Sequence, residues 1–189
     1  MLDDTRRALV LVGVVLSVGC NRAPDRGPAA DSSPAATATP GTITVTERGI
    51  GPLRAGMTLS EAAAALGGGA LVAPPSADTA GCHFVQWRRS PPGVRVMVEG
   101  GRIARVDVDS AGVLTAEGIG IGDTEEQVQR QYGGHAAVSP QKYGEGHYLT
   151  VTPNPSDTSY AIVFETNGGK VTRYRAGRRP QVEYVEGCG

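Results

Sequence analysis

The sequence is poor in features that several classes of protein need. Aromatic residues make up 5% of the chain, and Trp87 is the only tryptophan. The 18 lysine and arginine residues nearly balance the 19 aspartate and glutamate residues, so the formal net charge is −1. This balance implies no general polyanion partner, and we expect no nucleic-acid binding. An apolar run at residues 8–18 is shorter than the ~20 residues that a helix needs to span a bilayer.

Motifs for metal binding or phosphate binding are also scarce. The chain has three histidines, His83, His135 and His147. No two of them stand at a helical i,i+4 or an HxH spacing, and the chain has no CxxC motif, so we expect no metal site. The glycine-rich residues 118–122 lack the strand–GxGxxG–helix context and the lysine of a phosphate-binding loop. Their pattern favours a tight turn into a helix.

Two acidic residues, Asp107 and Asp109, are two positions apart and therefore share one face of a predicted strand. Paired carboxylates can perform acid–base chemistry, but a solvated strand end is the favoured interpretation. We therefore expect no enzymatic activity, no cofactor and no bound metal.

The N-terminus has the organisation of a secretory signal. Arg6 and Arg7 precede the apolar run, which ends in Gly19 and Cys20. A basic flank, a short apolar stretch and small residues before a cleavage site are typical of a signal peptide, which we place at residues 1–19. The alternative is a membrane anchor that stays uncleaved.

The end of this segment, Gly19-Cys20, resembles the lipobox of bacterial lipoproteins. The resemblance implies that Cys20 carries lipid such as palmitate and becomes the new N-terminus. The match departs from the usual pattern because Leu16 lies four residues before the cysteine, with Ser17 in the usual leucine position. In a cell with an outer membrane, Asn21 implies sorting to that membrane. We therefore expect an exported chain that contacts the membrane through its lipid anchor only.

The segment that includes Cys20 and continues to residue 41 is rich in Pro, Ala, Ser and Thr. Such a composition cannot bury enough apolar surface to offset the entropy of ordering, so residues 20–41 are predicted to be a flexible tether. The remaining residues, 42–189, have the size of one ordinary globular domain.

Cysteine usage agrees with export. If Cys20 carries lipid, Cys82 and Cys188 remain, and an oxidising compartment would join them. The alternative is a reactive Cys82 thiol beside His83.

An internal repeat organises the predicted domain. GMTLSEAAAALGG at residues 56–68 aligns without gaps on GDTEEQVQRQYGG at residues 122–134, an offset of 66 (122 − 56). Three further pairs of segments align at this offset or, after a two-residue insertion, at 68: 82–85 with 148–151, 94–99 with 160–165, and 100–106 with 168–174. Similar segments in one order predict two repeats, at about 49–110 and 116–176.

Each repeat is predicted to begin with a short helix that a capping box starts and a glycine ends. The capping pairs are Thr58–Glu61 and Thr124–Gln127, and the terminating glycines are Gly67 and Gly133. Alternating apolar residues then predict strands, and a last strand at residues 182–185 precedes Cys188. The predicted fold class is α+β: two tandem units of a short helix plus three antiparallel strands, with the helices packed on one face of a sheet.

The apolar alternation also predicts a strand register. Three-residue loops at 99–101 and 167–169 would place Val96 opposite Ala104 and Ile162 opposite Tyr174. This register buries one face of each hairpin. The predicted buried set is Val94, Val96, Val98, Val106, Val108, Tyr160, Ile162, Phe164 and Tyr174.

Several of these motifs resemble known families. Residues 56–58 (GMT), followed by Glu61 and by Leu-Gly at 66–67, are similar to the GMT…LG motif of the SmpA/OmlA family, small lipoproteins of outer-membrane barrel assembly. The turn at 98–103 resembles that family's second hairpin. The tandem units are similar in layout to the β-lactamase inhibitory protein, whose two repeats form one curved sheet with helices on its convex side.

The chain also departs from both families. The assembly lipoproteins have one unit, the second motif has Asp123 in place of Met, and no inhibitory loop matches. The resemblance therefore implies a fold and does not imply a partner, because a fold does not fix function.

The predicted register places four arginines on the outer face of the sheet, with Arg95 opposite Arg105 and with Arg173 and Arg175 in the second repeat. Like charges that face each other destabilise a sheet unless something compensates them. The functional interpretation is a basic face, extended by Lys170, Arg178 and Arg179, that docks an acidic partner. The alternative is a solvated face balanced by Glu99, Asp107, Asp109 and Glu183.

Together these features predict an exported lipoprotein that acts as a non-catalytic protein-binding or ligand-binding module of the cell envelope, with an envelope protein as its partner. The alternative function is inhibition of an exported hydrolase such as a β-lactamase.

Overall fold

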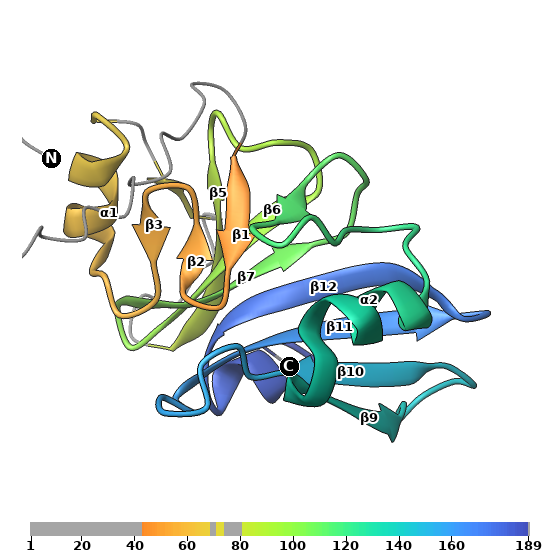
Figure 1. Cartoon of the computed structure of the whole chain (residues 1–189). Helices are drawn as coiled ribbons and strands as arrows, with labels where there is room; N and C mark the ends of the chain where they lie inside the picture. The colour runs from red at the N-terminus through yellow and green to blue at the C-terminus, as the bar shows by residue number, and fades with distance from the viewer. Residues whose placement is uncertain (1–42, 69–70, 74–80, 189) are drawn as a thin grey trace, which may run out of the picture. The chain divides into compact units, whose positions relative to one another are not determined.

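The computed structural model describes residues 43–68, 71–73 and 81–188. The predicted signal peptide, Cys20 and the predicted tether lie outside the described residues. Within them the fold is α+β, with mostly strands and two short helices (Figure 1). This confirms the predicted mixture of elements. No helix in the described residues is long and apolar enough to cross a bilayer.

Eight strands form one large sheet in which every neighbouring pair is antiparallel. Its spatial order is β4 (Leu71–Val72), β5 (Cys82–Trp87), β6 (Val94–Glu99), β7 (Arg102–Val108), β12 (Lys170–Arg178), β11 (Tyr160–Asn167), β10 (His147–Val151) and β9 (Ala136–Pro140). In Figure 1, green β7 and blue β12 lie side by side at the middle of this sheet.

Each helix is followed by four strands of this sheet, rather than by the three that the sequence predicts. The two additional strands, β4 and β9, are the edge strands. Neither has an alternating apolar pattern, because β4 has two residues and β9 is almost entirely exposed.

A second, smaller sheet has the order β3 (Leu53–Arg54), β2 (Gly49–Ile50), β1 (Thr44–Thr46) and β8 (Leu114–Thr115). Strands β1, β2 and β3 come before the first helix, and β8 joins β1 in parallel.

Both helices begin where the capping boxes predict. In α1 (Leu59–Ala65) the Glu61 carboxylate accepts the Thr58 N–H at 2.8 Å, and the Thr58 hydroxyl oxygen accepts the Glu61 N–H at 3.2 Å. In α2 (Glu125–Tyr132) Thr124 and Gln127 make the same pair of hydrogen bonds. A 3₁₀ turn, η1 (Gly133–His135), follows α2.

The predicted strand register is wrong by two residues. In the β6–β7 hairpin the turn contains only Gly100 and Gly101, both with positive φ (56° and 74°), as a two-residue type I′ turn requires. A bulge between Met97 and Val98 then shifts the pairing, so that Val96 lies opposite Val106.

The β11–β12 hairpin repeats these features. Its turn contains Gly168 and Gly169 (φ 57° and 76°), a register shift follows Glu165, and Phe164 lies opposite Tyr174. An error of two residues leaves every side chain on its predicted face, because side chains alternate with period two. The predicted buried set is therefore confirmed except for Tyr160, which is half-buried.

The main core lies on one face of the large sheet. Val45 of the small sheet, Ala62 of α1 and Val128 of α2 belong to the same buried cluster as Val96 and Ile162 of the large sheet. Figure 1 shows α2 in front of β11 and β12, with the small sheet in front of the β5–β7 side. We call the opposite face of the large sheet the outer face.

The central pair of strands requires a glycine. Gly177 of β12 lies opposite Arg105 of β7, and a Cβ at this glycine would lie 2.6 Å from the Arg105 Cα. Beside it, Ala176 pairs with Val106 and Arg175 pairs with Asp107.

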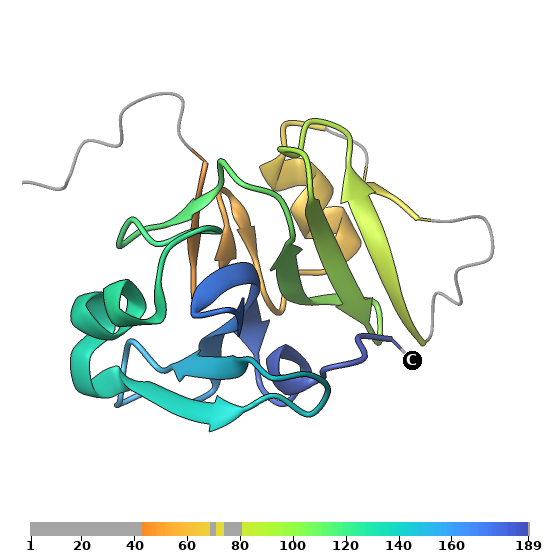
Figure 2. The ribbon, with the colours of Figure 1, turned by 90° about the vertical axis from the view of Figure 1, so that its right-hand side faces the viewer.

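The C-terminal strand predicted at residues 182–185 does not form. A 3₁₀ turn, η2 (Gln181–Glu183), takes its place. Strand β12 already pairs with β7 on one side and β11 on the other, so the chain that follows it has no free neighbouring edge. The dark blue end of the chain crosses the outer face instead and ends beside β5 (Figure 2).

A buried tyrosine gives the core a testable pH dependence. The Tyr132 hydroxyl oxygen lies 2.9 Å from the Thr115 hydroxyl oxygen and 2.8 Å from a Glu117 carboxylate oxygen. Burial raises the pKa of Tyr132 well above its ordinary value of about 10. The folded chain therefore keeps this proton at a pH where the unfolded chain loses it.

We expect the free energy of unfolding to fall as pH rises above about 10, because the folded state then binds more protons than the unfolded state. Tyr132→Phe should make this slope shallower by about 1.4 kcal/mol per pH unit in urea titrations. Tyr143→Phe, at an exposed tyrosine, controls for the loss of one phenol from the unfolded chain. Equal changes of slope in both variants would contradict the burial of Tyr132.

Candidate functional site

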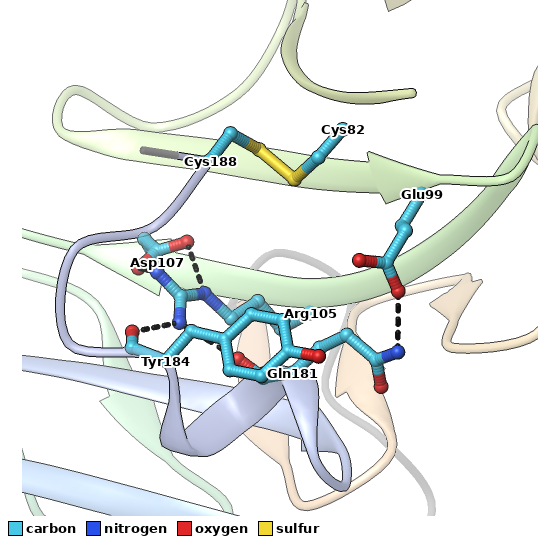
Figure 3. The surroundings of a disulfide bond; sticks show 7 residues. All are labelled: Cys82, Glu99, Arg105, Asp107, Gln181, Tyr184 and Cys188. Atoms are coloured by element: carbon cyan, nitrogen blue, oxygen red, sulfur yellow. Dashed lines mark hydrogen bonds and ion pairs between the residues drawn. A yellow bond between two sulfur atoms is a disulfide. The ribbon is translucent and has the colours of Figure 1, made fainter. Parts of the chain in front are cut away.

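Part of the outer face is covered by the end of the chain, residues 180–188, which we call the strap. A disulfide joins its end to the first residue of β5 (Figure 3). The Cys82 and Cys188 sulfurs are 2.02 Å apart, the Cα atoms are 5.3 Å apart, and 106 positions separate the two residues. The predicted pairing of these cysteines is confirmed.

Arg105 binds the main chain of the strap. Its Nη1 donates to the carbonyl oxygens of Gln181 at 2.8 Å and Tyr184 at 2.6 Å. Its Nε and Nη2 face the Asp107 carboxylate at 3.1 and 3.0 Å, and the Arg105 side chain is only 3% exposed (Figure 3). Burial raises the pKa of Asp107, although Arg105 acts in the opposite direction.

Arg175 makes equivalent contacts one strand away. Its Nε donates to the Val182 carbonyl oxygen at 2.5 Å, and its Nη1 pairs with the Glu165 carboxylate. Both side chains are 5% exposed. Three strap carbonyls therefore accept hydrogen bonds from two buried guanidinium groups, each of which also pairs with a carboxylate.

The other two predicted arginines stay at the rim. Arg95 has a 45% exposed side chain, lies over the Phe84 ring at 4.8 Å and reaches Asp109 at 3.9 Å. Arg173 has a 64% exposed side chain and pairs with Glu165 at 2.6 Å.

The predicted pairing of Arg95 with Arg105 is therefore wrong. The two-residue turn and the bulge put Asp107 opposite Arg95 and Met97 opposite Arg105. Opposite charges face each other where the prediction places like charges. The predicted continuous basic face is instead a mixed-charge surface with two exposed and two buried arginines.

The carboxylates that we expected to balance this face also have definite partners. Asp107 binds Arg105, Asp109 faces Arg95, Glu99 accepts a hydrogen bond from the Gln181 amide, and Glu183 accepts one from Arg179 at 2.7 Å. The contacts of Glu99 and Glu183 attach the strap, so these two carboxylates do not balance a solvated strand face.

An apolar contact completes the attachment of the strap. Val182 is fully buried against Ala161 and Val163 of β11, with Tyr148 packed beside them. Further along, the Glu186 carboxylate accepts hydrogen bonds from Lys142 at 3.2 Å and from the Tyr143 hydroxyl at 2.5 Å.

Two hollows border the strap. A hollow of about 150 Å³ is lined by the rim arginines Arg95 and Arg173 and by Gly187 of the strap. An open pocket of about 450 Å³ contains both cysteines of the disulfide in its lining, together with Lys142 and Tyr184. We call this second hollow the disulfide pocket.

The remaining residues that the sequence singles out do not converge. His83 is 6% exposed on β5, and neither ring nitrogen has a hydrogen-bond partner among the described residues. The His147 Nδ1 lies 2.9 Å from a Glu125 carboxylate oxygen. His135 ends the η1 turn. In the part of the chain that the structure describes, no group of three or more His, Cys, Asp or Glu side chains could hold a metal ion.

The glycine-rich residues 118–122 form a turn that leads into α2. Ile119 in this turn is buried, and the Gly120 N–H donates to the Asp123 carboxylate at 2.8 Å. These residues therefore form part of the packing beside α2, in agreement with the predicted tight turn into a helix.

Comparison of the chain with protein-family models, with curated proteins and with solved structures gives no match in any of the three. The site must therefore be interpreted from its own geometry.

Proposed function

We propose that this chain is an exported, lipid-anchored, non-catalytic protein-binding module of the cell envelope, which engages its partner through the outer face of the large sheet. One observation carries the proposal. The inner face of the sheet is covered by the helices and the small sheet, whereas the outer face has a hollow with Arg95 and Arg173 exposed on its rim.

The rim residues suit a protein partner. Arginine supplies a large contact area with several donors and is enriched in protein interfaces, as are aromatic residues such as Phe84. The exposed Asp109 beside Arg95 makes the rim a surface of mixed charge. A mixed-charge rim favours a partner with complementary charges of both signs over a uniformly acidic one.

The proposed localisation of the chain rests on its N-terminal sequence, where the lipobox-like Gly19-Cys20 precedes the predicted tether. We expect mass measurement of the mature N-terminus to find lipid on Cys20, and Cys20→Ala to leave the protein outside the membrane fraction. A free Cys20 thiol or an uncleaved chain would contradict lipidation.

We also infer that the two halves of the chain derive from one duplicated unit. The capping boxes, the glycine pairs in both hairpin turns and the matching bulges support this inference. Each half would then contain the helix and three strands that we predict. One more strand, β4 in the first half and β9 in the second, lies at the edge of the sheet.

The central strand pair gives independent support. At the offset of 68 (168 − 100), Asp107 corresponds to Arg175, and these two residues pair with each other. An axis relating the halves would pass through this pair. Two identical copies would place identical charges there, whereas a fused duplicate can place opposite charges there.

The likeness to the SmpA/OmlA family and to the layout of the β-lactamase inhibitory protein remains part of this proposal. Both likenesses rest on residue motifs and element order alone. They agree with a binding module in the cell envelope and leave its partner open.

The experiment is photo-crosslinking in intact cells. A photoreactive phenylalanine analogue replaces Arg95 or Arg173 on the outer face and, as the control, the exposed Arg130 on α2. We expect a discrete protein adduct from the two outer-face positions and none from Arg130. No adduct, or the same adduct from all three positions, would contradict the assignment. Capture and inhibition of an exported hydrolase would assign the inhibitor function instead.

A further inference from the structure

The strap is held through its main-chain carbonyl groups, in the way that a binding protein can hold a peptide. Arg105 and Arg175 contact the carbonyl oxygens of Gln181, Val182 and Tyr184, which any residue type would supply. Specificity would then come from individual side-chain pockets, as in other modes of peptide recognition.

The recognition groups do not depend on the strap for their charge balance. Asp107 of the same strand pairs with Arg105, and Glu165 of the neighbouring strand β11 pairs with Arg175, so each guanidinium group has a carboxylate partner within the sheet. A buried charge that lacks a partner is strongly unfavourable, whereas these pairs stay complete if the strap leaves. The strap supplies carbonyl acceptors and one apolar side chain, and another chain segment could supply both.

The strap itself adds no strand to the sheet. Within the described residues its backbone-to-backbone hydrogen bonds are local: the Glu183 N–H donates to the Pro180 carbonyl oxygen, and the Tyr184 N–H donates to that of Gln181. At its far end the Lys142–Glu186 ion pair is more than half exposed on both sides. Exposed pairs of this kind contribute little to stability, so the disulfide is the main tie at that end.

The disulfide can be reached from solvent, because both cysteines line the open disulfide pocket. An external dithiol could reduce it by exchange. One thiolate attacks a sulfur of the Cys82–Cys188 bond and releases the other sulfur as a thiolate, and the second thiol of the reductant then resolves the mixed disulfide. The chain is left with two thiols, and the reductant leaves as a disulfide.

We propose that the outer face is a groove for a short peptide segment of a partner protein that forms a turn like that of the strap. The strap occupies this groove while Cys82 and Cys188 are joined and vacates it when they are reduced. This inference rests on the proposed function, because it gives the outer face a class of partner and a control. The strap also indicates the chemistry of the segment. A valine-sized apolar residue fills the pocket of Val182, and an acidic residue four positions later reaches Lys142.

The probe is a fluorescent peptide with the sequence of residues 179–187, and the measurement is fluorescence anisotropy with the full chain. We expect saturable binding to the Cys82→Ser/Cys188→Ser variant and to the reduced wild type, and at least about tenfold weaker binding to the oxidised wild type. A probe with aspartate in place of Val182 should bind the variant at least about tenfold more weakly, because the pocket of this valine is apolar.

Three results would overturn the proposal: no binding to a folded serine variant, equal binding to the oxidised chain, or no effect of the aspartate in the probe. If the serine variant is unfolded by circular dichroism, the reduced wild type takes its place and should bind the probe. Unfolding of both the serine variant and the reduced wild type would show that the strap is a permanent part of the core. Dimerisation of the reduced chain would assign the groove to the strap of a second copy.

The two experiments distinguish failure of the peptide groove from failure of the proposed function. Loss of peptide binding with a protein adduct retained at Arg95 and Arg173 would leave the outer face as an interface and remove only the groove beneath the strap. Peptide binding without an adduct in cells would do the reverse.

Discussion

Arg105→Ala is expected to lower the free energy of unfolding by about 3–5 kcal/mol, the range for removing one partner of a buried ion pair. The change leaves the Asp107 carboxylate without its guanidinium and leaves the carbonyls of Gln181 and Tyr184 without a donor. Urea unfolding at neutral pH measures the loss. Arg95→Ala is the matched control, because it removes the same side chain from a 45% exposed site and should cost about 1 kcal/mol at most.

The loss should also depend on pH. Burial already raises the pKa of Asp107, and the loss of Arg105 raises this pKa further. A carboxyl with a raised pKa in the folded state favours folding below its unfolded pKa and loses that contribution as pH rises through its folded pKa. The deficit of Arg105→Ala relative to wild type should therefore be greatest at neutral pH and shrink on acidification.

Removing the carboxylate as well should recover stability. Arg105→Ala/Asp107→Ala leaves no unpaired buried charge, so it should be more stable than Arg105→Ala alone at neutral pH. A double variant with the summed loss of both single variants would contradict a direct pair. A loss for Arg105→Ala no larger than that for Arg95→Ala would show that the arginine is not buried under the strap.

The second large effect concerns the disulfide. Cys82→Ser/Cys188→Ser is expected to lower the free energy of unfolding by about 3–5 kcal/mol, because the bond closes a loop of 106 positions and restricts the unfolded chain. Thermal or urea unfolding of the oxidised wild type and the variant gives the difference. The same difference should appear when the wild type is reduced, whereas the serine variant should not respond to the reductant.

Reduction also distinguishes release of the strap alone from loss of the whole fold. If the strap alone is released, the reduced chain should keep its far-ultraviolet circular dichroism and its cooperative unfolding. Proteases should then cleave it within residues 180–188. Loss of the whole fold on reduction under native conditions would mean that the strap is needed for the sheet to form.

Local signals predicted the parts of the fold that depend on local chemistry. The capping boxes at Thr58 and Thr124 fixed where both helices begin, because a cap is satisfied within one turn of helix. The buried face of the hairpins was also predictable, since it depends only on alternation. The register was not, because a two-residue glycine turn followed by a bulge gives an offset that alternation cannot distinguish from a three-residue loop.

The strap is the part of the site that the sequence does not reveal. Arg105 meets carbonyl groups 76 and 79 positions away, and carbonyl groups carry no signature of residue type. Alternation assigned Arg105 and Arg175 to the outer face correctly. Whether that face is open or covered depends on the path of the chain after β12. The one useful signal was Cys188, because its bond to Cys82 requires the C-terminus to cross the sheet.

Hydrogen exchange at the strap tests most directly whether the outer face is a surface that the oxidised chain covers. The amides of Glu183 and Tyr184 donate to main-chain carbonyls inside the strap and should exchange slowly in the oxidised wild type. Reduction should speed their exchange while the amides of β11 and β12 stay protected. Fast exchange at both strap amides in the oxidised protein would contradict the claim that the strap covers the outer face. Loss of protection in β11 and β12 together with the strap would contradict its separate release on reduction.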